Sequence, residues 1–200
     1  MCIRDRFISR TLHADVLTES AKNYYLGQVY GLRAYYMYQL YRSWGDAVFT
    51  EEPSLGFEVG KLAKAATPAA EIFEQVKKDI ESSLSYFGPD YTIKEKKSLW
   101  SKAATLMLKA DVYLWSAHRD GGEGDARTAK NALVDIQNNI SRSNLDLMDT
   151  YQGVFAYDNK GNKEIIFTIH NELFEYNLWN GNNDLFPVSY THLRAHETSL

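Results

Sequence analysis

Half of the chain's fourteen tyrosines lie between residues 24 and 41, in a run that contains no proline. Apolar side chains recur in this run at intervals of three and four, which is the spacing of one face of an α-helix. This expected buried face comprises Tyr25, Val29, Leu32, Tyr36 and Leu40. The other tyrosines make the helix apolar nearly all round, which is typical of a helix buried on several sides. The run therefore predicts a central helix of a helical stack, with Gly27, Gly31 and Ala34 as a shallow strip for close packing.

Three further segments show the same helical spacing. The first begins at Thr67-Pro68, which supplies an N-cap hydroxyl and a proline at the first helical position, and ends at Gly88-Pro89. The second spans about 98–117, and the third extends to about residue 140 with Asp125 as its expected N-cap. The residues expected to be buried across the four helices are Tyr25, Leu32, Tyr36, Val76, Ile80, Met107, Ala110 and Ile136.

Residues 164–169 give the first β signal of the chain, because they are rich in β-branched residues and flanked by turn residues. All earlier elements are helical, and amphipathic helices with small residues at contact points are typical of antiparallel hairpins. No strict repeat of constant period is visible. The predicted fold class is therefore all-α, with TPR-like helical hairpins and one short β segment near 164–169.

Four blocks of the sequence resemble the SusD/RagB family, in the family's order. The first is Leu32-Arg33-Ala34-Tyr35-Tyr36, followed by Leu40-Tyr41-Arg42 and Trp44-Gly45-Asp46, with Ala47-Val48 where the family usually has Val-Pro. The others run from Thr67 to Ile80, from Lys102 to Leu114 and from Leu145 to Phe167. This resemblance implies TPR-like helix pairs that carry ligand-binding loops, and it implies that the chain is an internal piece of a longer protein.

The two ends of the chain do not share this resemblance. Residues 1–6 and 188–200 resemble translated sequencing-adapter sequence, so we expect residues 7–187 to be the SusD-like domain fragment and both ends to be non-native. Cys2, the single cysteine, follows no apolar run and is not expected to carry a lipid. His192 and His196 could face one metal ion on a helix, but the motif of a zinc protease is incomplete, and no metal site is predicted.

The composition disfavours several function classes. A net charge of −4 is a poor match to nucleic acid, which requires basic patches to neutralise its phosphates. No nucleophile, base and orienting group come together in the sequence, so we predict no catalytic residues, no cofactor and no enzymatic activity. Residues 120–125 hold three carboxylates that would suit calcium, but the EF-hand spacing is not met and a solvated connection between helices is the favoured interpretation.

The segment 176–184 has the composition of a sugar-binding loop. Its aromatic rings offer flat apolar faces, while its amides and carboxylate can donate to and accept from vicinal hydroxyl groups. An Asn/Gly-rich turn around a buried tryptophan is the alternative interpretation. Trp44, where the tyrosine-rich helix ends, is either a further sugar platform or a packed ring at a helix stop. The predicted carbohydrate-binding residues are Tyr176, Asn177, Trp179, Asn180, Asp184 and Trp44.

The resemblance also implies a function. Members of the SusD/RagB family are outer-membrane lipoproteins that bind glycans for a TonB-dependent transporter, so the expected ligand is an oligosaccharide and the expected partner a SusC-like transporter. The expected location is the cell outer membrane, exposed at the surface. The alternative is a TPR-type scaffold that binds a protein or peptide in a concave groove. A helical hydrolase ranks last, because it would need acids that converge in one cleft.

Overall fold

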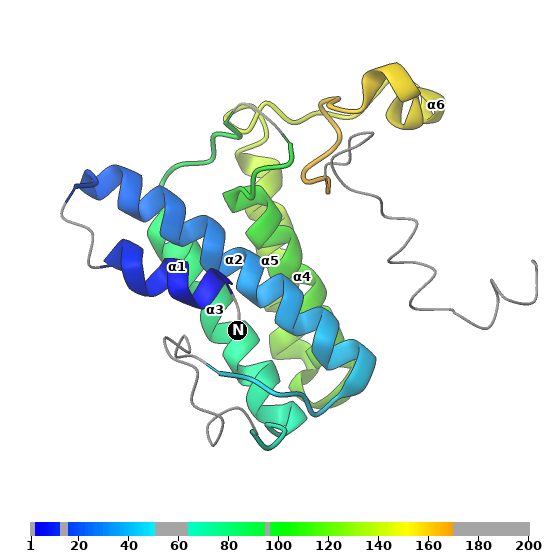
Figure 1. Cartoon of the computed structure of the whole chain (residues 1–200). Coiled ribbons are helices and arrows are strands. Elements are labelled where there is room, and N and C mark those ends of the chain that lie inside the picture. Colours follow the sequence, from blue (N-terminus) through cyan, green and yellow to red (C-terminus); the bar gives the residue numbers. More distant parts are fainter. Residues whose placement is uncertain (1–2, 13–15, 51–63, 95–96, 170–200) are drawn as a thin grey trace, which may run out of the picture. The chain divides into compact units, whose positions relative to one another are not determined.

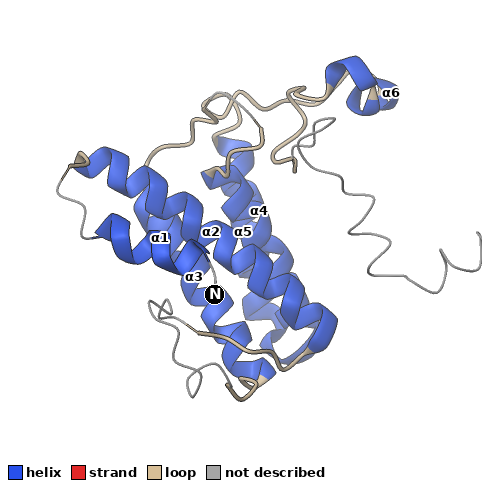
Figure 2. Ribbon diagram, in the orientation of Figure 1, coloured by secondary structure: helices blue, strands red, loops and turns tan. Residues whose placement is uncertain are grey.

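The computed structural model describes residues 3–12, 16–50, 64–94 and 97–169, and these residues are mainly helical (Figures 1 and 2). The elements are α1 (Ile3–Leu12), α2 (Glu19–Trp44), α3 (Ala69–Phe87), α4 (Lys102–Ser116), the π-helical turn η2 (Ala117–Gly121), α5 (Gly122–Asn138), α6 (Tyr151–Phe155) and the 3₁₀ turn η3 (Tyr157–Asn159). No strand occurs in the part that the structure describes. The all-α fold class is therefore confirmed.

Successive helices pack against each other in the order of the chain. Helix α2 packs mainly on α3, and α4 packs mainly on α5, while α3 also contacts α4 and α1 lies on α2 (Figure 1). The predicted domain boundary at residue 7 falls inside α1, and the one at residue 187 lies outside the described residues. None of the described helices combines the length and apolarity that crossing a bilayer requires.

Helix α2 buries a different face from the one that its spacing predicts. Tyr25 and Tyr36 are 41% and 46% exposed, and Met107 of α4 is 45% exposed. Those three predictions are wrong. Val76, Ile80, Ala110 and Ile136 are buried as predicted, and Leu32 is partly buried against the core. The buried residues of α2 are Leu26, Gly27, Gly31, Arg33, Ala34, Met37 and Tyr38.

Small residues determine this choice of face. A methyl group at Gly27 would lie 3.0 Å from the ring of Phe87, and one at Gly31 would overlap the indole of Trp100. The Trp100 indole approaches the α2 backbone so closely that only glycine fits at position 31, and the Phe87 ring leaves at most a tight fit for a methyl group at position 27. The strip of small residues therefore provides a close contact as predicted. The buried face of α2 is the face that contains this strip.

A buried ion pair joins α2 to α3. The Arg33 guanidinium donates from Nε to Oδ2 and from Nη2 to Oδ1 of Asp79, both at 2.6 Å. Gln75 donates a further hydrogen bond of 3.0 Å to the same carboxylate. Both charged residues are buried, and an enclosed pair of this kind is stable only when its hydrogen-bonding groups are matched. The contact therefore fixes the relative position of the two helices.

The predicted β segment at 164–169 is wrong. These residues run as turns and extended chain, and no strand lies among the described residues to pair with their backbone groups. The apolar side chains of Ile166 and Phe167 instead pack against the helical core. The β-branched pattern thus reflects burial, which strands and packed extended segments share.

The predicted N-cap at Asp125 is also wrong. Helix α4 passes through the π-helical turn η2 into α5, which begins three residues earlier, at Gly122. Gly122 has φ +55°, a conformation that favours glycine, and it allows the direction change between the two helices. Asp125 instead lies 3.8 Å from the ammonium group of Lys77 on α3.

Candidate functional site

Most of the predicted sugar-binding residues lie outside the part of the chain that the structure describes. These are Tyr176, Asn177, Trp179, Asn180 and Asp184. Trp44 is described: it is the last residue of α2, and its side chain is 65% exposed. The ring is therefore available at the surface, and it is not the packed ring of the alternative interpretation.

Asp46, two residues after Trp44, holds this end of α2 against the start of α3. Its Oδ1 accepts a hydrogen bond of 2.8 Å from the backbone N–H of Ala69. Ala47 and Thr67 exchange two backbone hydrogen bonds beside it, of 3.2 and 2.9 Å. The capping role predicted for the Thr67 hydroxyl is therefore wrong, because Asp46 caps α3 from a distant part of the chain.

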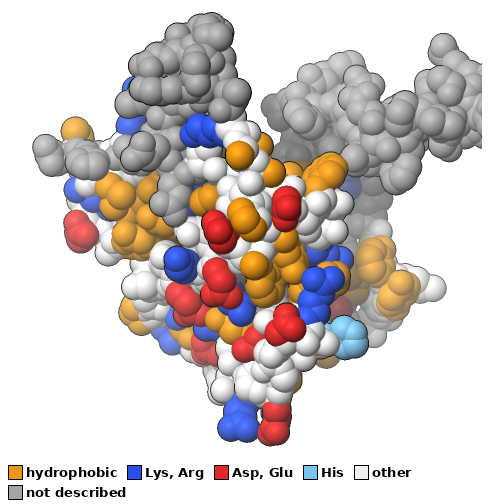
Figure 3. Space-filling model, turned by 90° about the horizontal axis from the view of Figure 1, so that it is seen from below, with side chains coloured by type: hydrophobic (Ala, Val, Ile, Leu, Met, Phe, Trp, Pro, Cys, Tyr) orange, Lys and Arg blue, Asp and Glu red, His pale blue; other side chains and the backbone are white. Residues whose placement is uncertain are grey.

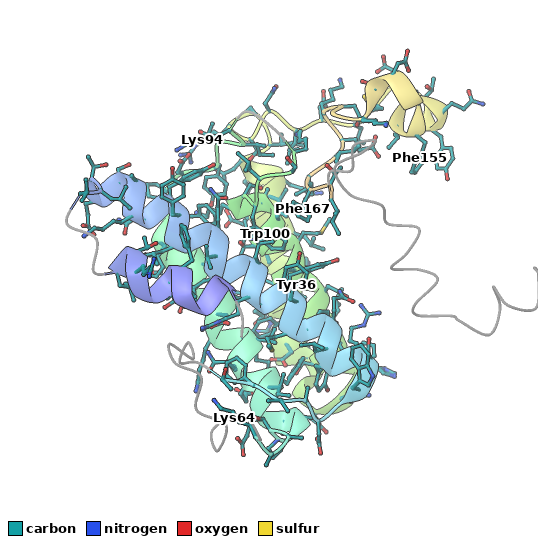
Figure 4. All side chains as sticks on the ribbon, viewed as in Figure 1. Tyr36, Lys64, Lys94, Trp100, Phe155 and Phe167 are labelled. Carbon is teal, nitrogen blue, oxygen red and sulfur yellow. The ribbon has the colours of Figure 1, made fainter. Side chains whose placement is uncertain are left out.

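A cavity of about 460 Å³ lies between α2, α4 and the segment 164–167. Its walls are mainly aromatic and aliphatic. The residues that line it are Tyr35, Trp100, Ala104, Met107, Leu108, Asp111, Glu164, Ile165, Ile166 and Phe167. The rings of Trp100 and Phe167 (Figure 4) meet edge to face with centroids 5.0 Å apart. The centroid of the Tyr35 ring lies 5.7 Å from that of Trp100. The cavity is thus bounded by three rings from three separate segments.

Two carboxylates supply the charged groups of this cavity. Asp111 is largely exposed and its Oδ2 lies 3.7 Å from a guanidinium nitrogen of Arg42. Glu164 accepts a hydrogen bond of 2.8 Å from the backbone N–H of Met148. The Trp100 N–H is already donated to Thr105, at 2.8 Å. An apolar cavity with a few placed acceptors is the usual composition of a small-ligand site.

A cluster of cations and rings lies beside the cavity. The Arg42 guanidinium is 5.4 Å from the ring centroids of both Tyr38 and Trp115. Arg119 lies 4.9 Å from the Trp115 ring and donates a hydrogen bond of 3.1 Å to the Tyr41 hydroxyl. Burial, with a smaller contribution from nearby Asp111, raises the pKa of Tyr38 to about 12. Tyr38 therefore stays a neutral phenol, and the cation–π contacts join α2 to the end of α4.

Metal chemistry finds no support in residues 3–12, 16–50, 64–94 and 97–169. No three histidine, cysteine, aspartate or glutamate side chains converge there in a way that could hold an ion. The acidic segment 120–125 belongs to this described part, and its carboxylates do not form such a group. His192 and His196 lie outside it.

The chain is similar to known proteins along most of its length. No protein-family model matches it. SusD-like protein P2 of Formosa agariphila is 30% identical over 153 residues, which are 76% of this chain and 28% of that protein. NanU of B. fragilis superposes with a TM-score of 0.80 at 45% identity, over 90% of this chain and 35% of that one. The chain belongs to the SusD/RagB family.

A further structure of the same fold carries a ligand. Surface glycan-binding protein A of Bacteroides thetaiotaomicron, solved in complex with laminarihexaose, superposes with a TM-score of 0.64 at 21% identity, over 84% of this chain and 32% of that one. At this identity the likeness shows a shared fold. The SusD-like chain thus spans about a third of the length of these relatives.

Two contacts in the structure join the first and second SusD-like blocks of the sequence. Arg33 belongs to the first SusD-like block and Asp79 to the second, and the ion pair between them joins the two blocks in space. Asp46 of the first block caps the helix that begins the second. The blocks therefore specify how the helices pack. The sequence alone does not predict the cavity, because its rings, at positions 35, 100 and 167, share no common motif.

Proposed function

We propose that this SusD-like chain is part of a protein that binds an oligosaccharide without cleaving it. The observation that carries the proposal is the family membership, together with a relative of the same fold solved in complex with laminarihexaose. On the face shown in Figure 3, acidic and basic side chains are interspersed and form no basic patch of the kind that a nucleic acid requires.

Two regions of the chain are separate candidates for sugar binding. The segment 176–184 offers Tyr176 and Trp179 as stacking faces, with Asn177, Asn180 and Asp184 as hydrogen-bonding groups. The cavity beside Trp100 offers further rings and two carboxylates that can accept hydrogen bonds from hydroxyl groups. Affinity would depend on how rigidly these groups are held before the sugar arrives.

The same proposal includes a partner and a location, which are those of the SusD/RagB family. The bound oligosaccharide would be passed to a SusC-like TonB-dependent transporter at the surface of the outer membrane. A lipid anchor on the full protein would hold it there. Copurification of the full protein with its transporter from membranes tests this part, and a full protein recovered only from the soluble fraction would contradict it.

The segment 176–184 makes the first testable prediction. Replacing Trp179 by alanine should remove most oligosaccharide binding, since a lost stacking face costs affinity, while the melting temperature stays close to that of the parent. Trp44→Ala is the comparison for stability. The Trp44 ring is 65% exposed, so this change should also leave the melting temperature nearly unchanged. Calorimetric titration against a panel that includes laminarihexaose measures both. Full affinity in Trp179→Ala would exclude the segment as the site.

The cavity makes the second prediction. Asp111→Asn keeps the size of the side chain but removes its charge, and should weaken oligosaccharide binding by roughly tenfold or more, the usual value of a hydrogen bond to a charged group. Glu81→Gln is the matched control, because this carboxylate is similarly exposed, also pairs with a cation and does not line the cavity. Equal affinities of the two variants in the same titration would show that the sugar binds outside the cavity.

A further inference from the structure

The loop between residues 146 and 164 presents three large apolar side chains to solvent. Leu147 is 72% exposed, Tyr151 80% and Phe155 70%. We call these three side chains the α6 face, since two of them lie on α6 (Phe155 is labelled in Figure 4). The two rings have centroids 5.0 Å apart and are tilted by 55°, so they form one continuous surface. Apolar surface gathered in this way marks an interaction site more often than scattered single residues do.

Polar groups hold this loop in a fixed conformation. At its base, the backbone N–H of Asp146 donates to the carbonyl of Lys163 at 3.1 Å, and the side chains of the same two residues pair at 3.1 Å. At its centre, the Asn162 side chain is buried and donates to the carbonyls of Val154 and Asn159, both at 2.9 Å. The loop thus satisfies its polar groups internally and turns its apolar side chains outward, the reverse of an ordinary surface loop.

The described part of the chain does not cover the α6 face. Among the described helices, α6 packs only against the adjoining turn η3. A helix of five residues has too few internal hydrogen bonds to be stable by itself, so tertiary contacts normally maintain it. An exposed apolar surface on such a short helix therefore favours a partner that buries it.

We propose that the α6 face is a contact surface for a further polypeptide segment of the same protein, equivalent to the part of the SusD-like relatives that this chain does not match. The chain covers only 28% of SusD-like protein P2 and 35% of NanU, so these relatives have ample additional chain to form such a contact. The mixture of one aliphatic and two aromatic side chains suits a packed protein surface. A sugar site would instead intersperse its rings with polar groups.

Thiol accessibility tests this inference in two proteins. One is the 200-residue chain, and the other is a fusion in which this chain replaces the matched region of NanU. Both carry Cys2→Ser and Phe155→Cys. The new thiol should react with a water-soluble disulfide reagent about tenfold or more slowly in the fusion, because burial permits reaction only after local opening. Glu123→Cys is the matched control: this exposed position on α5 should react equally fast in both proteins.

Three outcomes would overturn the inference. Equal rates for Phe155→Cys in both proteins would show that the face stays exposed. Slow reaction in the isolated chain, with light scattering that reports a dimer, would assign the face to a second copy. Protection of the isolated chain by laminarihexaose would assign it to a glycan. If the fusion does not fold, cysteines are placed in full-length NanU at the positions aligned with Phe155 and Glu123. Rapid reaction at the position aligned with Phe155 contradicts the inference.

Discussion

Replacing Arg33 by methionine is expected to destabilise the protein by about 3–5 kcal/mol, because it leaves the buried Asp79 carboxylate without its charge partner. Both side chains of this pair are almost fully enclosed, with relative exposures of 7% and 2%. Water can therefore not replace the two lost hydrogen bonds of 2.6 Å. Urea denaturation followed by circular dichroism measures the change in the free energy of unfolding.

Two further variants separate the charge effect from simple loss of a side chain. Arg42→Met removes a guanidinium whose ion pair with Asp111 is exposed and 3.7 Å long, so it should cost about 1 kcal/mol or less. Adding Asp79→Leu to Arg33→Met should restore much of the lost stability, since an apolar pair removes the buried carboxylate that has lost the Arg33 charge. Equal costs for Arg33→Met and Arg42→Met would mean that the buried pair does not stabilise the fold.

The sequence predicted the helices better than their buried faces. In α3 the apolar positions recur with the period of a helix and polar residues lie between them, and Val76 and Ile80 are buried as expected. In α2 most positions between 24 and 41 are apolar or aromatic, so spacing alone cannot select a face. The close approach of Phe87 and Trp100 selects the glycine strip instead. That contact joins residues more than fifty positions apart and leaves no local pattern.

The same limit applies to the candidate site. The cavity brings together Tyr35, Trp100 and Phe167, whose spacing in sequence contains no sign that they meet. The cap of α3 is a second case, because Asp46 reaches Ala69 across an intervening segment. The family resemblance was more informative than local patterns here, since the residues of two distant contacts, Arg33 with Asp79 and Asp46 with Ala69, lie in its blocks. It still does not identify the residues that bind a ligand.

Ile80→Ala is expected to destabilise the protein by about 2–5 kcal/mol, since it removes three carbon atoms from a fully buried position and leaves a cavity. Met107→Ala is the informative comparison, because the helical spacing predicts both residues to be buried while the structure leaves Met107 45% exposed. This second change should cost about 1 kcal/mol or less, since an exposed side chain loses little burial on truncation. Denaturation curves of both variants measure the difference. Equal losses would return Met107 to the core, as the spacing predicts, and would contradict the arrangement of α4 described above, in which Met107 opens onto the cavity.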